Sequence, residues 1–232
     1  MLMLAMIERH LTGRRETIVD LGCHSGFFLR LSASLEFKRF IGVDFFQLPA
    51  DRSFLTELPG AEFLKANLNT DRFLQLEDGG ADCVVATEVF EHLYHHPVAF
   101  LQECMRVLRP GGLLLLTTPN PATLANAVRL LRNRSTSWGA VDFAKTSKIT
   151  ASGEPLAVWD IHYFEYNADE LHQILRHVEK AEVVDSGFVA SAHAPHDGLA
   201  KKLAKTAQWK LGLGGSRAFS TTQYAVVRKQ VD

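Results

Sequence analysis

Short segments that are apolar at every position constrain the fold of this chain more than any other feature. Cys83–Ala86 reads Cys-Val-Val-Ala, and Leu113–Leu116 is a run of leucines. A strand with one solvent-facing side alternates apolar and polar residues, whereas a strand covered on both sides is apolar throughout. The segments with the composition of strands are Thr17–Leu21, Arg39–Asp44, Ala61–Ala66, Asp82–Ala86, Leu113–Thr118, Glu182–Ala190 and Thr222–Arg228. The sequence therefore predicts a sheet whose central strands are buried on both faces.

Segments with helical periodicity lie between these strands. Gly26–Phe37 has apolar residues close to every 3.6 positions, and so does Pro97–Leu108, which begins with a proline and is followed by Arg109-Pro-Gly-Gly112. Asn167-Ala-Asp-Glu170 is typical of a helix start, with asparagine as the cap and glutamate three residues on. This alternation predicts a parallel sheet with helices on both faces and with ligands bound at the carboxyl ends of its strands.

The length of 232 residues corresponds to one domain with an addition. We expect a single domain over residues 1–232, in which residues 133–158 form a lid or a substrate-binding insertion. That stretch is rich in Ser, Thr, Gly and Lys and is too long for a bare connection. Leu199–Leu211 combines apolar residues with four lysines, which favours a solvated helix packed on the domain over a helix on a membrane surface.

The charges of the chain nearly cancel, with 25 Lys and Arg against 26 Asp and Glu and a net charge of −1. This balance argues against binding of nucleic acid or of an anionic membrane by the surface as a whole. There is no run of about 18 apolar residues, so no membrane span is expected, and the apolar N-terminus lacks the features of a signal peptide. The three cysteines form no CxxC pair, which indicates free thiols in a reducing cytoplasm.

The segment Val19–Phe28, Val-Asp-Leu-Gly-Cys-His-Ser-Gly-Phe-Phe, carries the strongest sign of a binding site. A strand ends here in a glycine turn that opens a helix, so main chain can approach a ligand and the helix N-terminus adds a partial positive charge. Counted from Gly22, the third and sixth positions lack the glycines of a dinucleotide fingerprint, and the Gly-Lys-Ser/Thr of a P-loop is absent. Gly22 and Gly26, with Asp20 in front of them, fit a ligand of another kind.

This segment resembles the first motif of the class I S-adenosylmethionine-dependent methyltransferases, acid-x-Gly-x-Gly-x-Gly. Asp20, Gly22 and Gly26 match it, and His24 stands where the family usually has its middle glycine. The resemblance implies an α/β fold with a Rossmann-like, seven-stranded, mostly parallel sheet, helices on both faces and an antiparallel last strand. It also implies S-adenosyl-L-methionine as the cofactor. Asp20 and the main chain of Gly22 to His24 would meet its amino-acid end, where a carboxylate suits the ammonium group.

The resemblance, which is to the small-molecule branch of the family, continues in order from about Thr17 to Phe188. Asp44 matches the acid that accepts hydrogen bonds from the cofactor's ribose, and Asn67 stands where the family often has an acid for the adenine amino group. The other matching segments are Ala81–Leu93, Arg106–Leu113 followed by Thr117–Asn120, and His162–Leu171. The expected cofactor-binding residues are Asp20, Gly22, Cys23, His24, Gly26, Phe27, Asp44, Phe45, Asn67, Leu68, Thr87 and Glu88.

Two histidines are candidates for catalytic residues that accept a proton. His92 follows the fourth strand, beside the expected sulfonium pocket, and His162 precedes a helix on the side of the strand ends. The acceptor pocket is expected to include His162 and the aromatic residues Trp138, Trp159, Tyr163 and Phe164. No metal site is expected, because Pro97 interrupts the helix that would align His92 with His96 and no third ligand is evident nearby.

These patterns together predict an enzyme, a cytoplasmic methyltransferase that passes a methyl group in line to a small-molecule acceptor or biosynthetic intermediate. The receiving atom stays open among oxygen, nitrogen, carbon and sulfur, and a general base is needed only for a hydroxyl or a carbon acid. One alternative is a non-catalytic cofactor-binding or regulatory module with the same fold. Another is a protein or nucleic-acid methyltransferase, against which stand the balanced charge and the absence of an Asn/Asp-Pro-Pro-aromatic segment.

Overall fold

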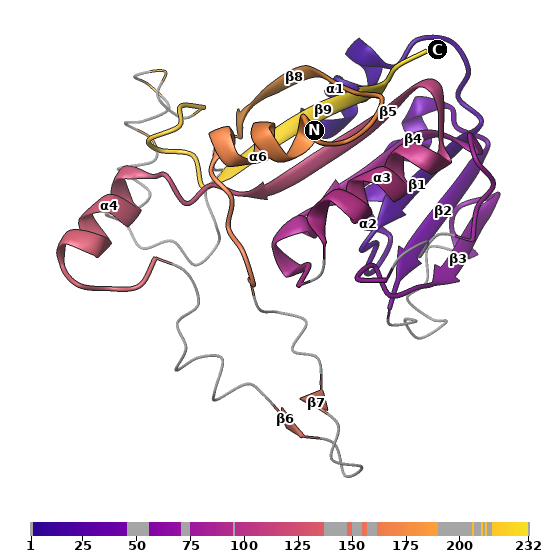
Figure 1. Ribbon diagram of the computed structural model, residues 1–232. Helices are drawn as coiled ribbons and strands as arrows, with labels where there is room; N and C mark the ends of the chain where they lie inside the picture. Colours follow the sequence, from indigo (N-terminus) through magenta and orange to yellow (C-terminus); the bar gives the residue numbers. More distant parts are fainter. Residues whose placement is uncertain are drawn as a thin grey trace.

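The computed structural model describes residues 2–45, 56–70, 75–94, 96–136, 148–149, 155–156, 162–189, 206, 210, 212 and 215–231 (Figure 1). Its strands are β1 (Thr17–Leu21), β2 (Arg39–Asp44), β3 (Ala61–Lys65), β4 (Ala81–Thr87), β5 (Leu108–Pro119), β6 (Lys148–Ile149), β7 (Pro155–Leu156), β8 (Ala181–Val189) and β9 (Thr222–Lys229). Its helices are α1 (Leu2–His10), α2 (Phe27–Ser32), α3 (Pro97–Val107), α4 (Leu124–Leu131) and α6 (Ala168–Leu175), with short 3₁₀ helices η1 (Ala33–Leu35) and η4 (Phe90–His92).

The main sheet has seven strands in the order β3-β2-β1-β4-β5-β9-β8. Neighbouring strands from β3 to β5 run parallel, and β9 runs antiparallel to both β5 and β8. The predicted mostly parallel sheet with an antiparallel last strand is therefore confirmed. The carboxyl ends of β1, β2 and β4 meet at one edge of this sheet, where a ligand site is expected in a fold of this kind.

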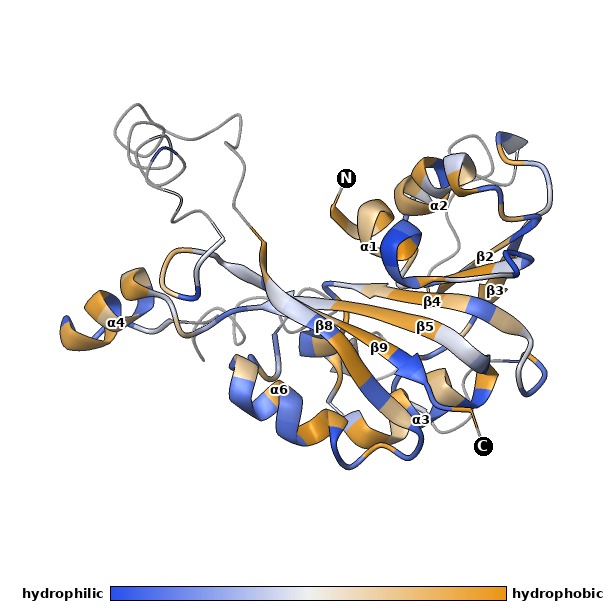
Figure 2. Ribbon diagram, turned by 90° about the horizontal axis from the view of Figure 1, so that it is seen from above, coloured by the Kyte–Doolittle hydropathy of each residue, from blue (hydrophilic) through white to orange (hydrophobic). Residues whose placement is uncertain are grey.

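Each face of the sheet has its own hydrophobic core (Figure 2). Helices α1 and α2 cover one face, and α3 and α6 cover the other. Alternate residues of the central strands point to opposite cores, so that Val84 and Leu114 lie in one core while Val85 and Leu115 lie in the other. These residues have no solvent exposure. Burial on both faces is thus the reason that the central strands are apolar at every position.

The structure adds to the sequence prediction in several places. Helix α1 was not predicted, and its Met6 and Ile7 are buried in the core on its side of the sheet. The stretch predicted as Gly26–Phe37 divides into α2 and the 3₁₀ helix η1. Strand β5 begins at Leu108, directly after α3, and its pairing with β4 shifts register between Leu108 and Leu113. The Pro-Gly-Gly segment therefore forms an irregularity inside β5 and does not separate the helix from the strand.

Helix α4 was not predicted either, and it has no buried residue. It stands away from the sheet in Figure 1, and Leu130 and Leu131 are exposed on it. The predicted insertion at 133–158 is described only at 133–136 and in the small hairpin of β6 and β7. The predicted helix at Leu199–Leu211 lies almost wholly outside the described residues. Among the described helices none is long and apolar enough to cross a membrane.

A buried carboxylate connects three parts of the fold at the amino ends of β1 and β4. Asp82, which has no exposed side-chain surface, accepts hydrogen bonds from the backbone of Glu16 and Thr17 and from Nε of Arg14 and of Arg109. Burial opposes ionisation of this carboxyl. The hydrogen bonds from Thr17, Arg14 and Arg109 outweigh that effect and hold its pKa below the usual value. Asp82 therefore ties the start of β1 and the irregular part of β5 to β4.

Replacement of Asp82 by Asn should lower the free energy of unfolding by about 2–4 kcal/mol, because the amide loses the charge that Arg14 and Arg109 share. A carboxyl whose pKa is lowered by folding stabilises the folded state at pH values above its unfolded pKa. This stabilisation is lost as the pH falls through the folded pKa. Urea denaturation should thus show a loss of stability below about pH 4 in the unmutated protein and a smaller one in Asp82→Asn.

The matched control is Glu62→Gln, which breaks the exposed pair of Glu62 with Arg39. An exposed pair of this kind is worth about 1 kcal/mol or less. Equal losses in the two variants would show that Asp82 does not have the anchoring role.

Candidate functional site

The glycine turn after β1 has the left-handed backbone that its glycines permit. Gly22 has φ of +71°, and its N–H donates to the carbonyl of Val43 on β2 at 2.8 Å. A β-carbon at this position would lie 2.6 Å from Cγ2 of Val89, a contact too close for any side chain. Gly26 has φ of +66° at the start of α2. Both glycines of the motif therefore occupy left-handed backbone that favours glycine.

His24, which replaces the middle glycine of the motif, also has a left-handed backbone, with φ of +42°. Its N–H donates to Oδ2 of Asp44 at 2.9 Å. The acid at the end of β2 thus holds the turn after β1 in place. The predicted residues Gly22, His24 and Asp44 are brought together as expected, and the histidine keeps the turn that a glycine would give.

Asp20 lies beneath this turn and is almost completely buried. Its Oδ1 has no hydrogen-bond partner among the described residues. Burial, together with the nearby charge of Asp44, raises the pKa of this carboxyl to about 8. A buried carboxyl in this state is stabilised by a cationic group, and the ammonium of an amino acid is one that suits it.

The other predicted cofactor residues are arranged less uniformly. Cys23 is buried, whereas Phe27 is 64% exposed. The ammonium nitrogen of Lys65 lies over the ring of Phe45, 5.6 Å from the ring centre. Oδ1 of Asn67 accepts a hydrogen bond from the N–H of Asn69 at 3.0 Å, which fixes the orientation of that amide.

Leu68 lines a cavity of about 620 Å³ together with Asn69, Thr70, Leu93, His96, Ala99, Phe100 and Gln102. This cavity lies between the end of β3 and helix α3. It adjoins Asn67, which was predicted to contact the adenine. The size and position of the cavity are compatible with part of a nucleoside.

The end of β4 forms the second half of the candidate site. Thr87 is its last residue, and Glu88 follows with φ of +52°. The N–H of Glu88 donates to the carbonyl and to Oγ1 of Thr117 on β5, at 3.0 and 3.1 Å. This strained turn directs the chain into η4, which carries Glu91 and His92.

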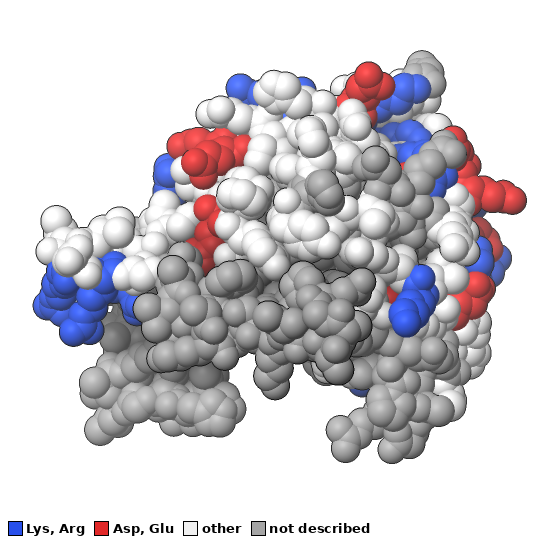
Figure 3. Space-filling view, turned by 60° about the horizontal axis from the view of Figure 1, so that its bottom comes forward, with Lys and Arg blue, Asp and Glu red and all other residues white. Residues whose placement is uncertain are grey.

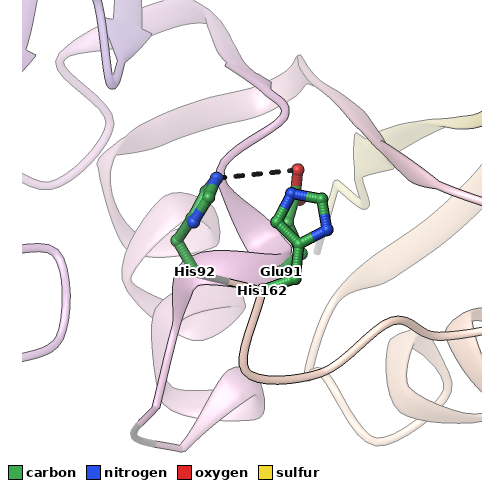
Figure 4. A group of neighbouring side chains, drawn as sticks. All are labelled: Glu91, His92 and His162. Carbon is green, nitrogen blue, oxygen red and sulfur yellow. Dashed lines mark ion pairs between the residues drawn. The ribbon is translucent and has the colours of Figure 1, made fainter. Parts of the chain in front are cut away.

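The two candidate histidines, far apart in the sequence, are neighbours in the structure (Figure 4). The ring centres of His92 and His162 lie 5.0 Å apart, edge to face. The N–H of Tyr163 donates to the carbonyl of Glu91 at 2.8 Å and so docks this segment against η4. Nδ1 of His162 lies 2.7 Å from Oε1 of Glu165, a carboxylate that orients the ring.

Not all of the predicted acceptor pocket is described. Trp138 and Trp159 lie outside the described residues. Tyr163 packs against Tyr94 with ring centres 5.4 Å apart, and Phe164 is exposed and stacks on Tyr166. His96, by contrast, is exposed at the start of α3.

Glu91 is the functional candidate that the sequence analysis missed. Its side chain has no exposure, Oε2 accepts from Oγ1 of Thr118 at 3.0 Å, and Oε1 has no hydrogen-bond partner among the described residues. Burial, with the nearby charges of Glu88 and Glu165, raises the pKa of Glu91 to about 8. The sequence signal was an acid next to the buried Val89 and Phe90, where a surface residue is not expected.

Comparison with known proteins places this geometry in a family. Residues 19–116 match the family model described as "Methyltransferase domain". The chain carries a class I S-adenosylmethionine-dependent methyltransferase domain. The predicted family and its cofactor, S-adenosyl-L-methionine, are thereby confirmed.

Curated relatives agree with this assignment. The domain is 30% identical over 172 residues to the "Probable S-adenosylmethionine-dependent methyltransferase MT3114" of Mycobacterium tuberculosis, a match that covers 74% of this chain and 48% of the relative. It is 28% identical over 125 residues to the ubiquinone biosynthesis O-methyltransferase of Maricaulis maris, covering 53% and 48%. The chain thus spans about half the length of these relatives.

A crystal structure of an S-adenosylmethionine-dependent methyltransferase from Mesorhizobium loti has the same fold, with a TM-score of 0.61 and 16% identity. The match covers 97% of this chain and 95% of that one.

Substitution of Gly22 by Ala should destabilise the methyltransferase domain by about 2–4 kcal/mol, because the methyl group meets Val89 and the backbone is left-handed. Gly13→Ala is the matched control, since Gly13 has φ of +81° and nothing within 4 Å of an added β-carbon. We expect that variant to lose only about 1–2 kcal/mol.

Thermal or urea unfolding measures both losses, and Val89→Ala in the Gly22→Ala background should recover part of the stability. If Gly13→Ala and Gly22→Ala lost the same stability, the contact with Val89 would have no role in the choice of glycine.

Proposed function

We propose that this protein transfers a methyl group from S-adenosylmethionine to a small-molecule acceptor, such as a biosynthetic intermediate. The observation that carries the proposal is the buried Oδ1 of Asp20 beneath the glycine turn, which has no hydrogen-bond partner in the part of the chain that the structure describes. A carboxyl in such a position needs a cation, and an amino-acid ligand brings one. The donor set thus fits the amino-acid end of the cofactor.

Within this proposal Asp20 and the main chain of Gly22 to His24 hold the amino-acid end. Asp44 lies at the end of β2, where it accepts a hydrogen bond from the His24 N–H, and it also accepts hydrogen bonds from the ribose hydroxyls. Asn67 and Leu68 contact the adenine beside the cavity between β3 and α3. Thr87 and Glu88 border the methyl group at the end of β4. When bound, the cofactor supplies a methyl carbon already activated by its sulfonium.

The reaction needs little acid–base chemistry from the protein. In methyl transfer a bond forms between the acceptor atom and the methyl carbon as the carbon–sulfur bond breaks, and its electron pair stays on sulfur. Alignment of the two reactants and exclusion of water are worth about 7–11 kcal/mol of the barrier. His162, oriented by Glu165, and His92 beside it are the groups that would accept a proton from a hydroxyl acceptor.

Three observations support a small acceptor over a polymer. The net charge is −1, and the described part of the face in Figure 3 mixes acidic and basic residues apart from a basic group over α4. A groove for nucleic acid would carry a continuous basic surface. The Maricaulis maris relative is named for ubiquinone biosynthesis, a small-molecule pathway.

Cys23, Cys83 and Cys104 are free and buried, which supports a reducing compartment such as the cytoplasm.

Binding of S-adenosylhomocysteine should tighten as the pH rises from 6 to 7.5, by up to about tenfold per pH unit. The sign follows from the Asp20 pKa of about 8: the carboxyl is mostly protonated at pH 6, and the ligand's ammonium favours its ionised form. Isothermal titration at several pH values measures this dependence. Asp20→Asn should bind weakly and almost without pH dependence.

Asp44→Ala provides the comparison, because it removes the expected ribose contact and leaves the Asp20 carboxyl in place. It should weaken binding at every pH while keeping a dependence on pH. If the unmutated protein binds no S-adenosylhomocysteine at any pH, the proposed function fails.

The acceptor class can be tested with methyl-labelled cofactor and cell extract fractionated by size. We expect label in small-molecule fractions, identified by mass spectrometry, and none in protein or nucleic acid. Label in a protein or nucleic-acid fraction would favour a methyltransferase that acts on protein or nucleic acid. Cofactor binding with no labelled product would favour a non-catalytic module.

A further inference from the structure

Three side chains at the acceptor side of the candidate site form a cluster with the composition of a metal site. Glu91, His92 and His162 each offer one ligand atom, and these atoms all lie within 4.8 Å of one another. Two of the residues come from η4 and one from the segment before α6 (Figure 4). In the sequence, His92 with the adjacent Glu91 is paired by spacing with His96, whereas His162 lies 70 residues further along the chain and is not apparent as a ligand.

Glu91 supplies the observation that points to a ligand. Its Oε1 is buried and without a hydrogen-bond partner among the described residues, and it lies 3.9 Å from Nε2 of His92. Figure 4 shows this oxygen and the two imidazole rings directed toward one another. A buried carboxyl oxygen without a partner is costly, and a bound cation would remove that cost.

Glu165 provides an outer contact that metal-binding histidines commonly have. Its Oε1 lies 2.7 Å from Nδ1 of His162, so Nε2 is the nitrogen that can bind an ion. A carboxylate on the second ring nitrogen fixes the tautomer and orientation of a metal-ligating histidine and raises its basicity. His162 is therefore prepared as a ligand by a residue that does not itself belong to the cluster.

The charges around the cluster are also those of a cation site. Glu88 and Glu165 both lie close enough to Glu91 to act on its carboxyl. Among the described residues, the ion pairs of Glu91 and Glu165 are with histidines, and none is with Lys or Arg. Three carboxyl groups, those of Glu88, Glu91 and Glu165, thus lie near one another beside the imidazoles of His92 and His162.

We propose that Glu91, His92 and His162 bind a divalent transition-metal ion of the zinc type. Two imidazoles and one carboxylate are a donor set for Zn²⁺ or Fe²⁺ that leaves coordination positions open. Ligand atoms around a tetrahedral zinc ion lie about 3.4 Å apart, so the cluster needs to contract by roughly 1 Å. His92 and His162 are partly exposed, whereas Glu91 is buried and held by Thr118, so the contraction would have to come from the two imidazoles.

The open position suggests the kind of acceptor, an inference that rests on the proposed function. A hydroxyl oxygen bound to such an ion loses its proton more readily, as water does on zinc. The proton passes to solvent, the oxygen bonds to the methyl carbon, and the sulfonium leaves as a neutral thioether. The cluster would then serve an oxygen acceptor, and the two histidines would act as ligands in place of bases.

The test is a titration of the full chain, first treated with a chelator, with Zn²⁺ by calorimetry and with Co²⁺ by its visible absorption. We expect one equivalent of each ion to bind, with a Co²⁺ spectrum typical of nitrogen and oxygen ligands. His92→Ala and His162→Ala should each weaken Zn²⁺ binding at least tenfold. Glu165→Gln, which changes only the outer contact, should weaken it about tenfold.

His96→Ala and His172→Ala are the matched controls, since His96 is exposed, His172 is partly exposed and both lie outside the cluster. Both variants should bind Zn²⁺ within twofold of the unmutated protein. The buried Glu91 is left unchanged, so that loss of folding does not confuse the result, and circular dichroism checks each variant. Equal affinities of His162→Ala and His96→Ala would overturn the site, as would absence of Zn²⁺ binding.

Binding of S-adenosylhomocysteine, measured on the same samples, separates the two proposals. Cofactor binding without Zn²⁺ binding would leave the proposed function intact and remove the metal site. Zn²⁺ binding that His162→Ala abolishes, without cofactor binding, would establish the site and remove the proposed function.

Discussion

Burial of the central strands on both faces is the constraint on which this structure depends. Strands β4 and β5 lie between two hydrophobic cores, and their side chains alternate between them. Polar groups are costly along such a strand, so they are displaced to its ends. The polar side chains at the carboxyl ends of β1, β2 and β4 therefore gather at the candidate site, whereas Asp82 near the opposite end of β4 serves as an anchor.

Much of this fold could be predicted from local sequence. The bounds of β1 and β2 are those expected, because an apolar run with polar ends leaves little choice of register. The Asn167 capping box starts α6 as its sequence indicates. The glycine turn and Asp44 were predicted by their motif, and their contact is a direct consequence of parallel pairing between β1 and β2.

Residues that depend on distant partners could not be predicted in the same way. Helix α1 is held by its contact with the sheet, with no cap signal at its start. Glu91 is explained by Thr118, which lies 27 residues later in the chain. His92 and His162 meet only because the segment before α6 docks on η4. No periodicity or local spacing records such a contact, so these residues emerge only from tertiary structure.

The position of β9 has a consequence for the order in which the sheet can assemble during synthesis. β9 follows β8 in the sequence but lies between β5 and β8. Until the ribosome has released residues 222–229, β8 has no strand to pair with, and the apolar edge of β5 stays uncovered. An uncovered edge strand is a template for aggregation. The nascent chain thus exposes an aggregation-prone edge in the interval between the appearance of β5 and that of β9.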